Sequence, residues 1–378
     1  MATVSATFVD TLRSRRWRAF DLQLFLYVGL LIVFGAVIGY SANFEADGAT
    51  TGLPQTVRTL IWTAIGLTLF FVASSIDYHW LQTFATPIYI AVLVLLSLTG
   101  LVGTSLFGAQ MSINVAGLDF QFSEISKVLM IVVLASFLAT RGDRIGRLST
   151  IVGAAALVAV PAILVYRQPD LGTALVFVAI LFGMLFMSGA SIGWMALLTG
   201  AAIAAAPMAV GALQEYQRQR LFCFLDASAD PQGACYQLVQ ALNAVGSGGW
   251  LGQGLTAGRQ NQLGFLPVQS TDFIFTVVAE ELGFVGCALL LGLFGLLVWR
   301  VLRIGWGAQD SLGMLVAVGL GSLLLFQITV NVGMVTGIMP VTGIPLPFVT
   351  YGGSSMISLL FGLGILQSVR MHAWKPTF

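Results

Sequence analysis

Residues 171–189 read LGTALVFVAILFGMLFMSG, an apolar stretch without a charged side chain. A run of about 17–25 such residues is long enough to cross the hydrocarbon core of a bilayer as a helix. Nine further stretches of this kind occur in the chain, at 21–40, 57–74, 84–105, 124–140, 150–166, 192–211, 273–299, 311–336 and 350–369. We therefore expect an all-α polytopic membrane protein with about ten transmembrane helices.

The composition supports this class and excludes several others. Of the 378 residues, 57% are apolar and only 9% are charged, against roughly 25% charged in a soluble domain. A net charge of +1 provides no basic surface for nucleic acid. Two histidines and three cysteines are too few for a typical His/Cys metal cage or iron–sulfur cluster. Neither lysine, Lys127 or Lys375, lies in a Walker A motif, which excludes an ATP-driven pump.

Basic residues predict the orientation. If the N-terminus lies in the cytoplasm, 11 of the 17 Lys and Arg residues fall on the inner side, namely Arg13, Arg15, Arg16, Arg18, Arg141, Arg144, Arg147, Arg300, Arg303, Arg370 and Lys375. An even number of spans then places both termini in the cytoplasm. We expect a basic N-terminal segment over 1–20 that is retained rather than cleaved, a transmembrane domain over 21–370 and a cytoplasmic tail over 371–378.

Two connections on the outer side are unusual. Residues 212–271, between the seventh and eighth spans, form a loop of 60 residues, and loops of this length are usually functional. The connection over 337–355 is rich in proline and glycine. Irregular backbone at membrane depth must be buried in protein or line a wet cavity.

Asp272 stands directly before the apolar stretch 273–299. It is either a helix-start acid favoured by the helix dipole, or a carboxylate held at the membrane surface to act as a general base. Glu280 and Glu281 follow on the same stretch, about 12 Å deeper if the helix is continuous. We expect these two acids to bond polar groups inside the bundle and to be structural.

Further charged residues lie near the outer ends of other spans. Glu124 and Lys127, three residues apart, either form an ion pair on one helix face or line a polar cavity together with Arg58 and Asp170. Asp170, in Gln168-Pro-Asp-Leu-Gly-Thr, is placed to cap the next helix.

The start of the long loop carries two arginines. Arg218 and Arg220 suit an anionic headgroup or pyrophosphate, although an interfacial helix explains them nearly as well. Cys223 and Cys235 lie in the same loop, and their spacing leaves open whether they form a disulfide.

Six motifs, taken together, resemble the SEDS family of shape, elongation, division and sporulation proteins. They run in order over nearly the whole transmembrane domain: 121–127 (QFSEISK), 168–173 (QPDLGT), 216–220 (YQRQR), 265–275 (FLPVQSTDFIF), 279–283 (AEELG) and 345–355 (PLPFVTYGGSS). The stretch Asn261–Pro267 is more similar to the elongation branch of the family than to its division branch.

The resemblance implies a peptidoglycan glycosyltransferase that polymerises lipid II at the outer face of the cytoplasmic membrane. Asp272 falls on the family's essential aspartate, and the residues that fall on its sensitive cavity positions and last motif are Arg58, Glu124, Lys127, Asp170, Ser354 and Ser355. The implied partners are a class B penicillin-binding protein and other membrane proteins of the elongation complex. The resemblance specifies no cofactor, and a divalent cation, Mg²⁺ or Mn²⁺, remains a candidate.

Three positions depart from the family pattern. Gln110 is followed by Met111-Ser112 where the family usually has Arg-Trp, Phe122 replaces a proline, and Thr350 replaces a serine. Three other functions stay open: a lipid II flippase or transporter, a division enzyme with the same chemistry, and a membrane scaffold. The clustering of acids at the outer ends of the spans and the length of the outer loop favour the elongation enzyme.

Overall fold

The structure is a computed structural model that describes residues 17–43, 55–102, 104–106, 109–115, 118–211, 213–228, 230–262 and 271–373. Most of the expected N-terminal segment, part of the tail and part of the stretch Asn261–Pro267 lie outside these residues. Between 102 and 119 only the backbone is described, so the side chains of the departure at Gln110, Met111 and Ser112 lie outside as well.

Each of the ten apolar stretches corresponds to a long helix. These helices are α2 (Leu22–Ala42), α4 (Gln55–Ser75), α6 (Ala85–Val102), α7 (Phe122–Ala139), α8 (Leu148–Tyr166), α9 (Leu171–Met187), α10 (Ile192–Gly211), α14 (Ile274–Trp306), α15 (Ser311–Val335) and α16 (Gly353–His372). Shorter helices connect them, namely α5 (His79–Thr83), the 3-10 helix Gly142–Arg144, α11 (Glu215–Leu225), α12 (Tyr236–Ser247) and α13 (Arg259–Gln262).

The chain is a multi-pass membrane protein with a helical bundle fold. Within the described residues, seven helices have the length and hydropathy to cross a membrane, and three more apolar helices are shorter in their described parts. A small antiparallel sheet adds to the all-α fold that we expected. Its strands are β1 (Thr104–Leu106), β2 (Ala109–Val115) and β3 (Leu118–Phe120), which pair in the order β1-β2-β3.

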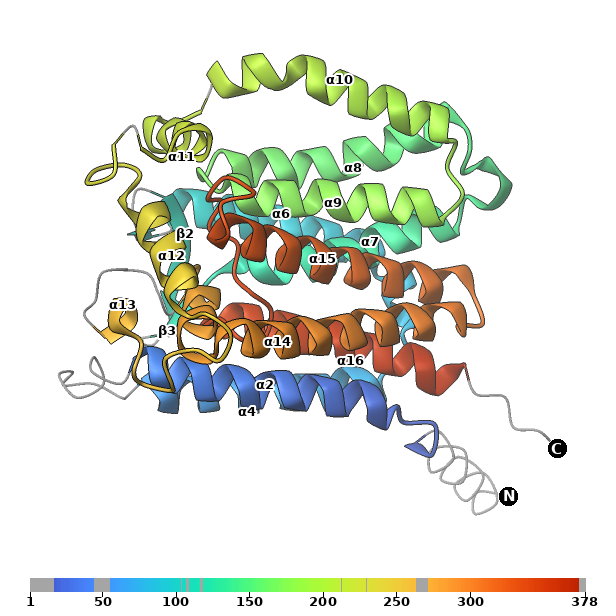
Figure 1. Ribbon diagram of the computed structural model, residues 1–378. Coiled ribbons are helices and arrows are strands. Elements are labelled where there is room, and N and C mark those ends of the chain that lie inside the picture. Colours follow the sequence, from blue (N-terminus) through green and yellow to red (C-terminus); the bar gives the residue numbers. More distant parts are fainter. Residues whose placement is uncertain are drawn as a thin grey trace.

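The long helices lie side by side, with the short helices α11, α12 and α13 and the sheet at one end and the start of α2 and the end of α16 toward the other (Figure 1). We call these the loop end and the termini end. Helix α15 packs against α14, α9 and α7, and α16 packs against α4 and α7. Most residues of α7, α15 and α16 are buried, so these helices form the core.

Helix α14 is broken at Gly283, which has φ 63° and ψ −159°. Residues 248–254 fill the break: the N–H groups of Gln253 and Gly254 donate to the carbonyls of Glu280 and Glu281 at 2.9 and 3.0 Å. In the same way, the N–H groups of 284 and 285 donate to the carbonyls of 249 and 250. The backbone groups that the break leaves without helical partners are therefore satisfied by this loop.

The two parts of α14 lie at different places along α2. Ser41, next to last in α2, donates to the Glu281 carboxylate at 2.6 Å. Arg300 instead pairs with Asp21, the N-cap at the opposite end of α2, at 2.6 Å. The part over 284–306 therefore runs antiparallel along α2 and provides the span.

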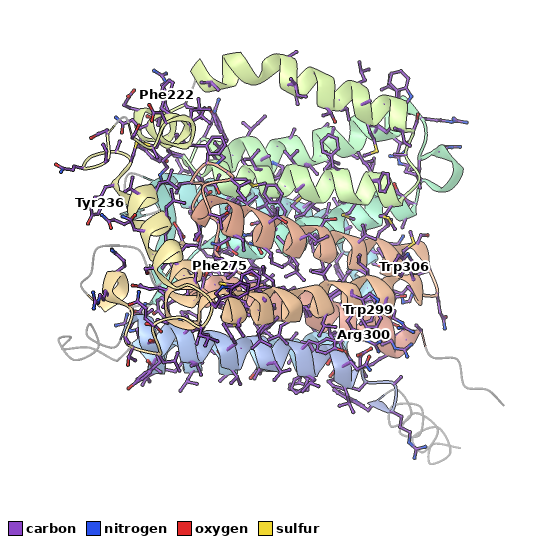
Figure 2. The ribbon with its side chains drawn as sticks, viewed as in Figure 1. Phe222, Tyr236, Phe275, Trp299, Arg300 and Trp306 are labelled. Carbon is purple, nitrogen blue, oxygen red and sulfur yellow. A yellow bond between two sulfur atoms is a disulfide. The ribbon has the colours of Figure 1, made fainter. Side chains whose placement is uncertain are left out.

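The first part, 274–282, begins deeper in the bundle. Thr350 donates to the carbonyl of Thr271 at 3.2 Å. The residues just before Thr350 lie against Gly35 of α2: a Cβ added at Gly35 would meet the Phe348 carbonyl and the Val349 Cα. Gly35 is about 9 Å inside Ser41 along α2. Figure 2 likewise shows Phe275 inside the bundle, and its side chain is 3% exposed.

The prediction that Glu280 and Glu281 lie about 12 Å deeper than Asp272 is therefore wrong. The helix that starts after Asp272 runs toward the loop end and stops at Gly283, so the two glutamates lie at the loop end of α2. Both are buried, and the Glu280 carboxylate accepts from the N–H of Gln260 at 2.8 Å. Their structural role is supported, while the single span expected over 273–299 is two segments.

The irregular segment 337–352 lies inside the protein, as irregular backbone at this depth requires. The apolar side chains of its later part are buried: Ile344, Leu346, Phe348 and Val349 are each no more than 3% exposed, whereas Ile338 near its start is 71% exposed. The segment enters from the end of α15 and leads into α16, and it brings its backbone next to the start of α14.

The termini end is held by ion pairs. Asp21 caps α2 and receives three contacts of 2.6–3.0 Å from Arg300. The side chain of His79 contacts Asp77 at 2.6 Å and Asp310 at 3.0 Å. The labelled residues Trp299, Arg300 and Trp306 lie toward this end in Figure 2.

Candidate active site at the loop end

Asp272 lies in the turn before α14, beside Arg220 of α11 and Gly343 of the segment 337–352. A Cβ added at Gly343 would lie 3.2 Å from Asp272 Oδ2 and 3.8 Å from Arg220 Nη1. Gly343 has φ 73°, a conformation that favours glycine. Three segments that are far apart in the sequence thus meet here, and the Asp272 carboxylate and the Arg220 guanidinium both lie next to Gly343.

Asp272 as a residue is partly exposed although its carboxyl group is largely buried, and no ion pair or hydrogen bond within the described residues holds its carboxylate. Burial raises the pKa of Asp272 to about 6, against the nearby Arg220 charge, which lowers it, while Asp170 adds to the increase. A carboxyl with this pKa is ionised at neutral pH and is a stronger base than an ordinary aspartate. Of the two interpretations of Asp272, these features favour the general base.

Asp170 caps α9, as we expected from its turn: its carboxylate accepts from the N–H of Thr173 at 2.9 Å. Burial raises the pKa of the Asp170 carboxyl, although this hydrogen bond and the charge of Lys127 favour its ionised form. The preceding carbonyl, of Pro169, accepts from the Tyr216 hydroxyl at 2.7 Å and from the Gln217 amide at 3.0 Å. The turn therefore docks α11 onto the bundle.

Glu124 and Lys127 form an ion pair of 2.6 Å, and both residues are at most 3% exposed. Their charges also act on the carboxyl of Asp170. The ion-pair interpretation is therefore confirmed, while the lining of a polar cavity together with Arg58 and Asp170 stays a prediction. Phe122 begins α7 after the N-cap Gln121, so the family's proline is not needed for this turn.

Ser354, Ser355 and Arg58 border the same region. The Ser354 hydroxyl accepts from the N–H of Gln121 at 2.8 Å, which joins the starts of α16 and α7. Ser355 is buried. Arg58 is half-buried on α4, one turn from Trp62, whose ring lies against Gly353. Among the described residues no ion pair or hydrogen bond involves Arg58, so its charge remains available to a ligand.

The two arginines of α11 differ. Arg220 lies over the ring of Tyr216, 5.6 Å from its centroid, and its charge acts on Asp272. Arg218 pairs with Glu215 at 3.9 Å and donates to the Gly211 carbonyl at 3.4 Å. The structure therefore brings Arg220 to Asp272 but pairs Arg218 locally.

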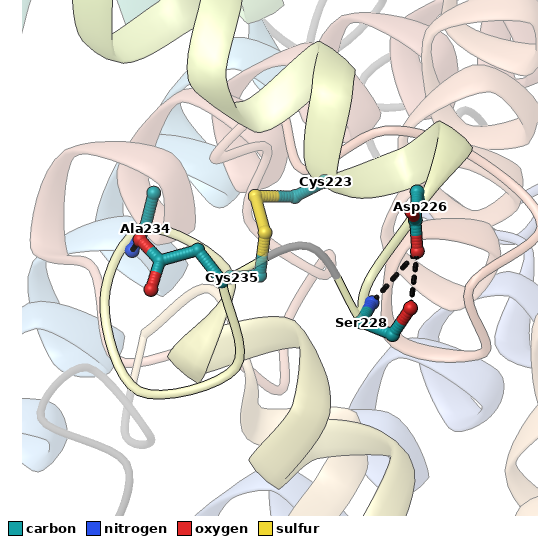
Figure 3. The surroundings of a disulfide bond; sticks show 6 residues. Cys223, Asp226, Ser228, Ala234 and Cys235 are labelled. Carbon is teal, nitrogen blue, oxygen red and sulfur yellow. Dashed lines mark hydrogen bonds between the residues drawn. A yellow bond between two sulfur atoms is a disulfide. The ribbon is translucent and has the colours of Figure 1, made fainter.

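Cys223 and Cys235 form a disulfide with Cα atoms 5.2 Å apart (Figure 3). The bond joins the end of α11 to the start of α12, which settles the alternative that the sequence left open. Next to it, Asp226 accepts from the N–H and hydroxyl of Ser228. The disulfide fixes the helix that carries Arg220.

No group of three His, Cys, Asp or Glu side chains within the described parts of the chain is arranged to hold a metal ion. Within these parts no residue is therefore assigned as a ligand for the Mg²⁺ or Mn²⁺ considered above.

Sequence reasoning missed Asn331. Its side-chain amide donates to the carbonyls of Asp272 and Ile344 at 2.9 and 2.7 Å. The signal was a buried amide within the apolar stretch 311–336, because polar residues at membrane depth are functional candidates. Thr350 was noticed only as a departure from the family pattern.

Comparisons with known proteins agree with this fold. The peptidoglycan glycosyltransferase MrdB of Escherichia coli (strain K12) is 38% identical over 355 residues, which cover 93% of this chain and 94% of MrdB. A probable peptidoglycan glycosyltransferase FtsW of Trichlorobacter lovleyi is 36% identical over 363 residues, which cover 94% of each chain.

Solved structures are similar over the same length. The crystal structure of the rod shape determining protein RodA of Thermus thermophilus matches with a TM-score of 0.70 and 31% identity, over 95% of this chain and 99% of RodA. A chain of a peptidoglycan synthase complex, studied for the coordination of polymerization and crosslinking, matches with a TM-score of 0.80 and 32% identity, over 94% and 99%.

A family model described as "Cell cycle protein", which covers FtsW, RodA and SpoVE, matches residues 22–375. The match spans nearly the whole chain and includes every candidate site residue. The protein therefore belongs to the FtsW/RodA/SpoVE family, the SEDS family that its motifs resemble.

Proposed function

We propose that this chain polymerises lipid II into glycan strands, with Asp272 as the general base. Peptidoglycan glycosyl transfer is the activity named for its relatives MrdB and FtsW, and it is the activity of this chain. The observation that carries the assignment of the base is the Asp272 carboxylate beside Arg220 and Gly343, which has no ion-pair partner among the described residues and a pKa raised by burial to about 6.

The reaction is one displacement. The 4-hydroxyl of the acceptor sugar attacks the anomeric carbon of the donor, and the bond from that carbon to the pyrophosphate oxygen breaks. Asp272 takes the hydroxyl proton, and the α-linked donor becomes a β-linked product without a covalent enzyme intermediate. The departing pyrophosphate carries the negative charge, and a cation close to it stabilises the transition state.

Arg220 and Arg58 are the cations best placed for this role. Arg220 lies beside Asp272, and Arg58 has no ion-pair partner among the described residues. Lys127 is already paired with Glu124, and Arg218 with Glu215. We assign Lys127, Glu124, Asp170, Ser354 and Ser355 to the wall of the cavity and Arg218 to its rim.

We further propose ten spans, both termini in the cytoplasm and an active site on the outer face of the cytoplasmic membrane. The ten long helices support this count, and the distribution of Lys and Arg supports the orientation. A disulfide in the long loop fits an oxidising compartment. By analogy with the peptidoglycan synthase complex, the partner is a class B penicillin-binding protein, together with other elongation proteins.

The test is polymerisation of labelled lipid II by the purified protein, alone and with its partner, resolved on gels. Asp272→Asn keeps the size of the side chain and removes the base, so we expect the rate to fall by about 10²–10⁴-fold. A lysozyme digest checks that the ladders are glycan. Ladders that persist in Asp272→Asn would contradict the assignment of the base, whereas lipid II translocation into liposomes without any ladder would favour a flippase.

A further inference from the structure

Two side chains hold the backbone at Asp272. The amide of Asn331 donates to the carbonyls of Asp272 and Ile344 at 2.9 and 2.7 Å. The hydroxyl of Thr350 donates to the carbonyl of Thr271 at 3.2 Å and accepts from the N–H of Leu346 at 2.7 Å. Both residues therefore tie the turn that carries Asp272 to the segment 337–352.

The other hydrogen bonds of this turn are main-chain bonds at the start of α14: the N–H of Ile274 donates to the carbonyl of Thr271 at 3.4 Å and the N–H of Thr276 to the carbonyl of Phe273 at 2.9 Å. The N-cap of α14, Phe273, makes no side-chain cap hydrogen bond. Within the described residues the Asp272 carboxylate is held by neither an ion pair nor a hydrogen bond. The position of the carboxylate thus depends on the position of its backbone, to which Asn331 and Thr350 are bonded.

Helix α15 offers an internal comparison. Gln327, one turn from Asn331, is also 0% exposed. Neither its amide nitrogen nor its amide oxygen has a hydrogen-bond partner in the described part of the chain. Two buried amides on one helix therefore differ in whether they bond the backbone of Asp272.

We propose that Asn331 and Thr350 are positioning residues that place the Asp272 carboxylate for proton abstraction. This inference rests on the proposed role of Asp272 as the base. A base must lie within hydrogen-bond reach of the hydroxyl that it deprotonates, and a displacement of about 1 Å can cost about 10²-fold in rate. Neither residue needs to touch the substrate.

The first experiment compares Asn331→Leu with its matched control Gln327→Leu in full-length protein with its partner. For Asn331→Leu we expect kcat to fall about 10–100-fold with little change in KM, because the base moves while the binding groups stay. The acidic limb of the pH profile should also move below pH 6 toward 3.8, since a released Asp272 regains water. Gln327→Leu should keep the wild-type kcat, the wild-type KM and the wild-type position of the acidic limb of the pH profile.

The second experiment is independent of Asn331. Thr350→Val removes the hydroxyl at nearly constant volume, and Thr350→Ser keeps it. We expect Thr350→Val to lower kcat and shift the acidic limb in the same direction, and Thr350→Ser to restore both. The two Thr350 variants test the positioning role if Asn331→Leu does not fold.

The outcomes separate this inference from the proposed function. If Asp272→Asn is inactive while Asn331→Leu behaves like Gln327→Leu, positioning is wrong and the base assignment stands. A loss of kcat in Asn331→Leu and Thr350→Val with an unmoved acidic limb also overturns positioning. If Asp272→Asn keeps its activity, the base assignment itself is wrong.

Discussion

Asp21 and Asp272 each stand just before a long helix, and the protein uses them in opposite ways. At the termini end, Asp21 caps α2 and pairs with Arg300, and its side chain is 0% exposed. At the loop end, Asp272 caps nothing, and within the described residues no ion pair holds it. The comparison shows that residue type and helix position do not distinguish a structural carboxylate from a reactive one, whereas its partners do.

Exchanging each aspartate for asparagine tests this comparison with the largest expected effects. Asp272→Asn should lose about 10²–10⁴-fold in rate at an unchanged unfolding temperature. Asp21→Asn keeps a capping side chain but leaves Arg300 without its buried partner, which should cost about 3–5 kcal/mol of stability. Its folded fraction should keep the wild-type kcat. Thermal unfolding in detergent and gel-resolved polymerisation measure the two effects, and a loss of kcat in folded Asp21→Asn would break the comparison.

The pair of Glu124 and Lys127 sharpens the comparison between the two ends of the molecule, because this pair is a buried ion pair at the loop end. Lys127→Met leaves the Glu124 carboxylate buried and unpaired, so we expect a loss of about 3–5 kcal/mol. The double variant Glu124→Gln/Lys127→Met should recover most of that stability but not the activity, if the pair also lines the cavity. Recovery of both would make the pair purely structural.

The smallest expected effect is a shift of the pH profile in Arg220→Gln, which is separate from the fall in rate expected when a cation near the pyrophosphate is lost. In the wild type, activity should be half-maximal near pH 6 and fall as the pH drops below it, because only ionised Asp272 accepts a proton. The guanidinium of Arg220 lowers the pKa of Asp272, so Arg220→Gln should move the acidic limb to higher pH by about one unit or less. Arg218→Gln is the control, since Arg218 pairs with Glu215 and its loss should leave the limb in place.

The sequence predicts much of this molecule where the signal is local. Ten apolar stretches correspond to the ten long helices, and the Asp170 cap and the spacing of Glu124 and Lys127 follow from neighbouring residues. The break at Gly283 escapes such reasoning, because the apolar stretch continues through it and the loop 248–254 completes it from a distance. The bond from Asn331 to Asp272 spans 59 positions, and no local pattern specifies it.

The broken α14 also bears on how the protein is made. Only the part over 284–306 is apolar and long enough for the insertion machinery to recognise as a span, because 274–282 is short and carries two glutamates. The short part must then enter the bundle after insertion, together with the loop that satisfies its end and the later helix α15 that bonds its start. The region around Asp272 is therefore completed late in biogenesis, once α15 and the segment after it are in place.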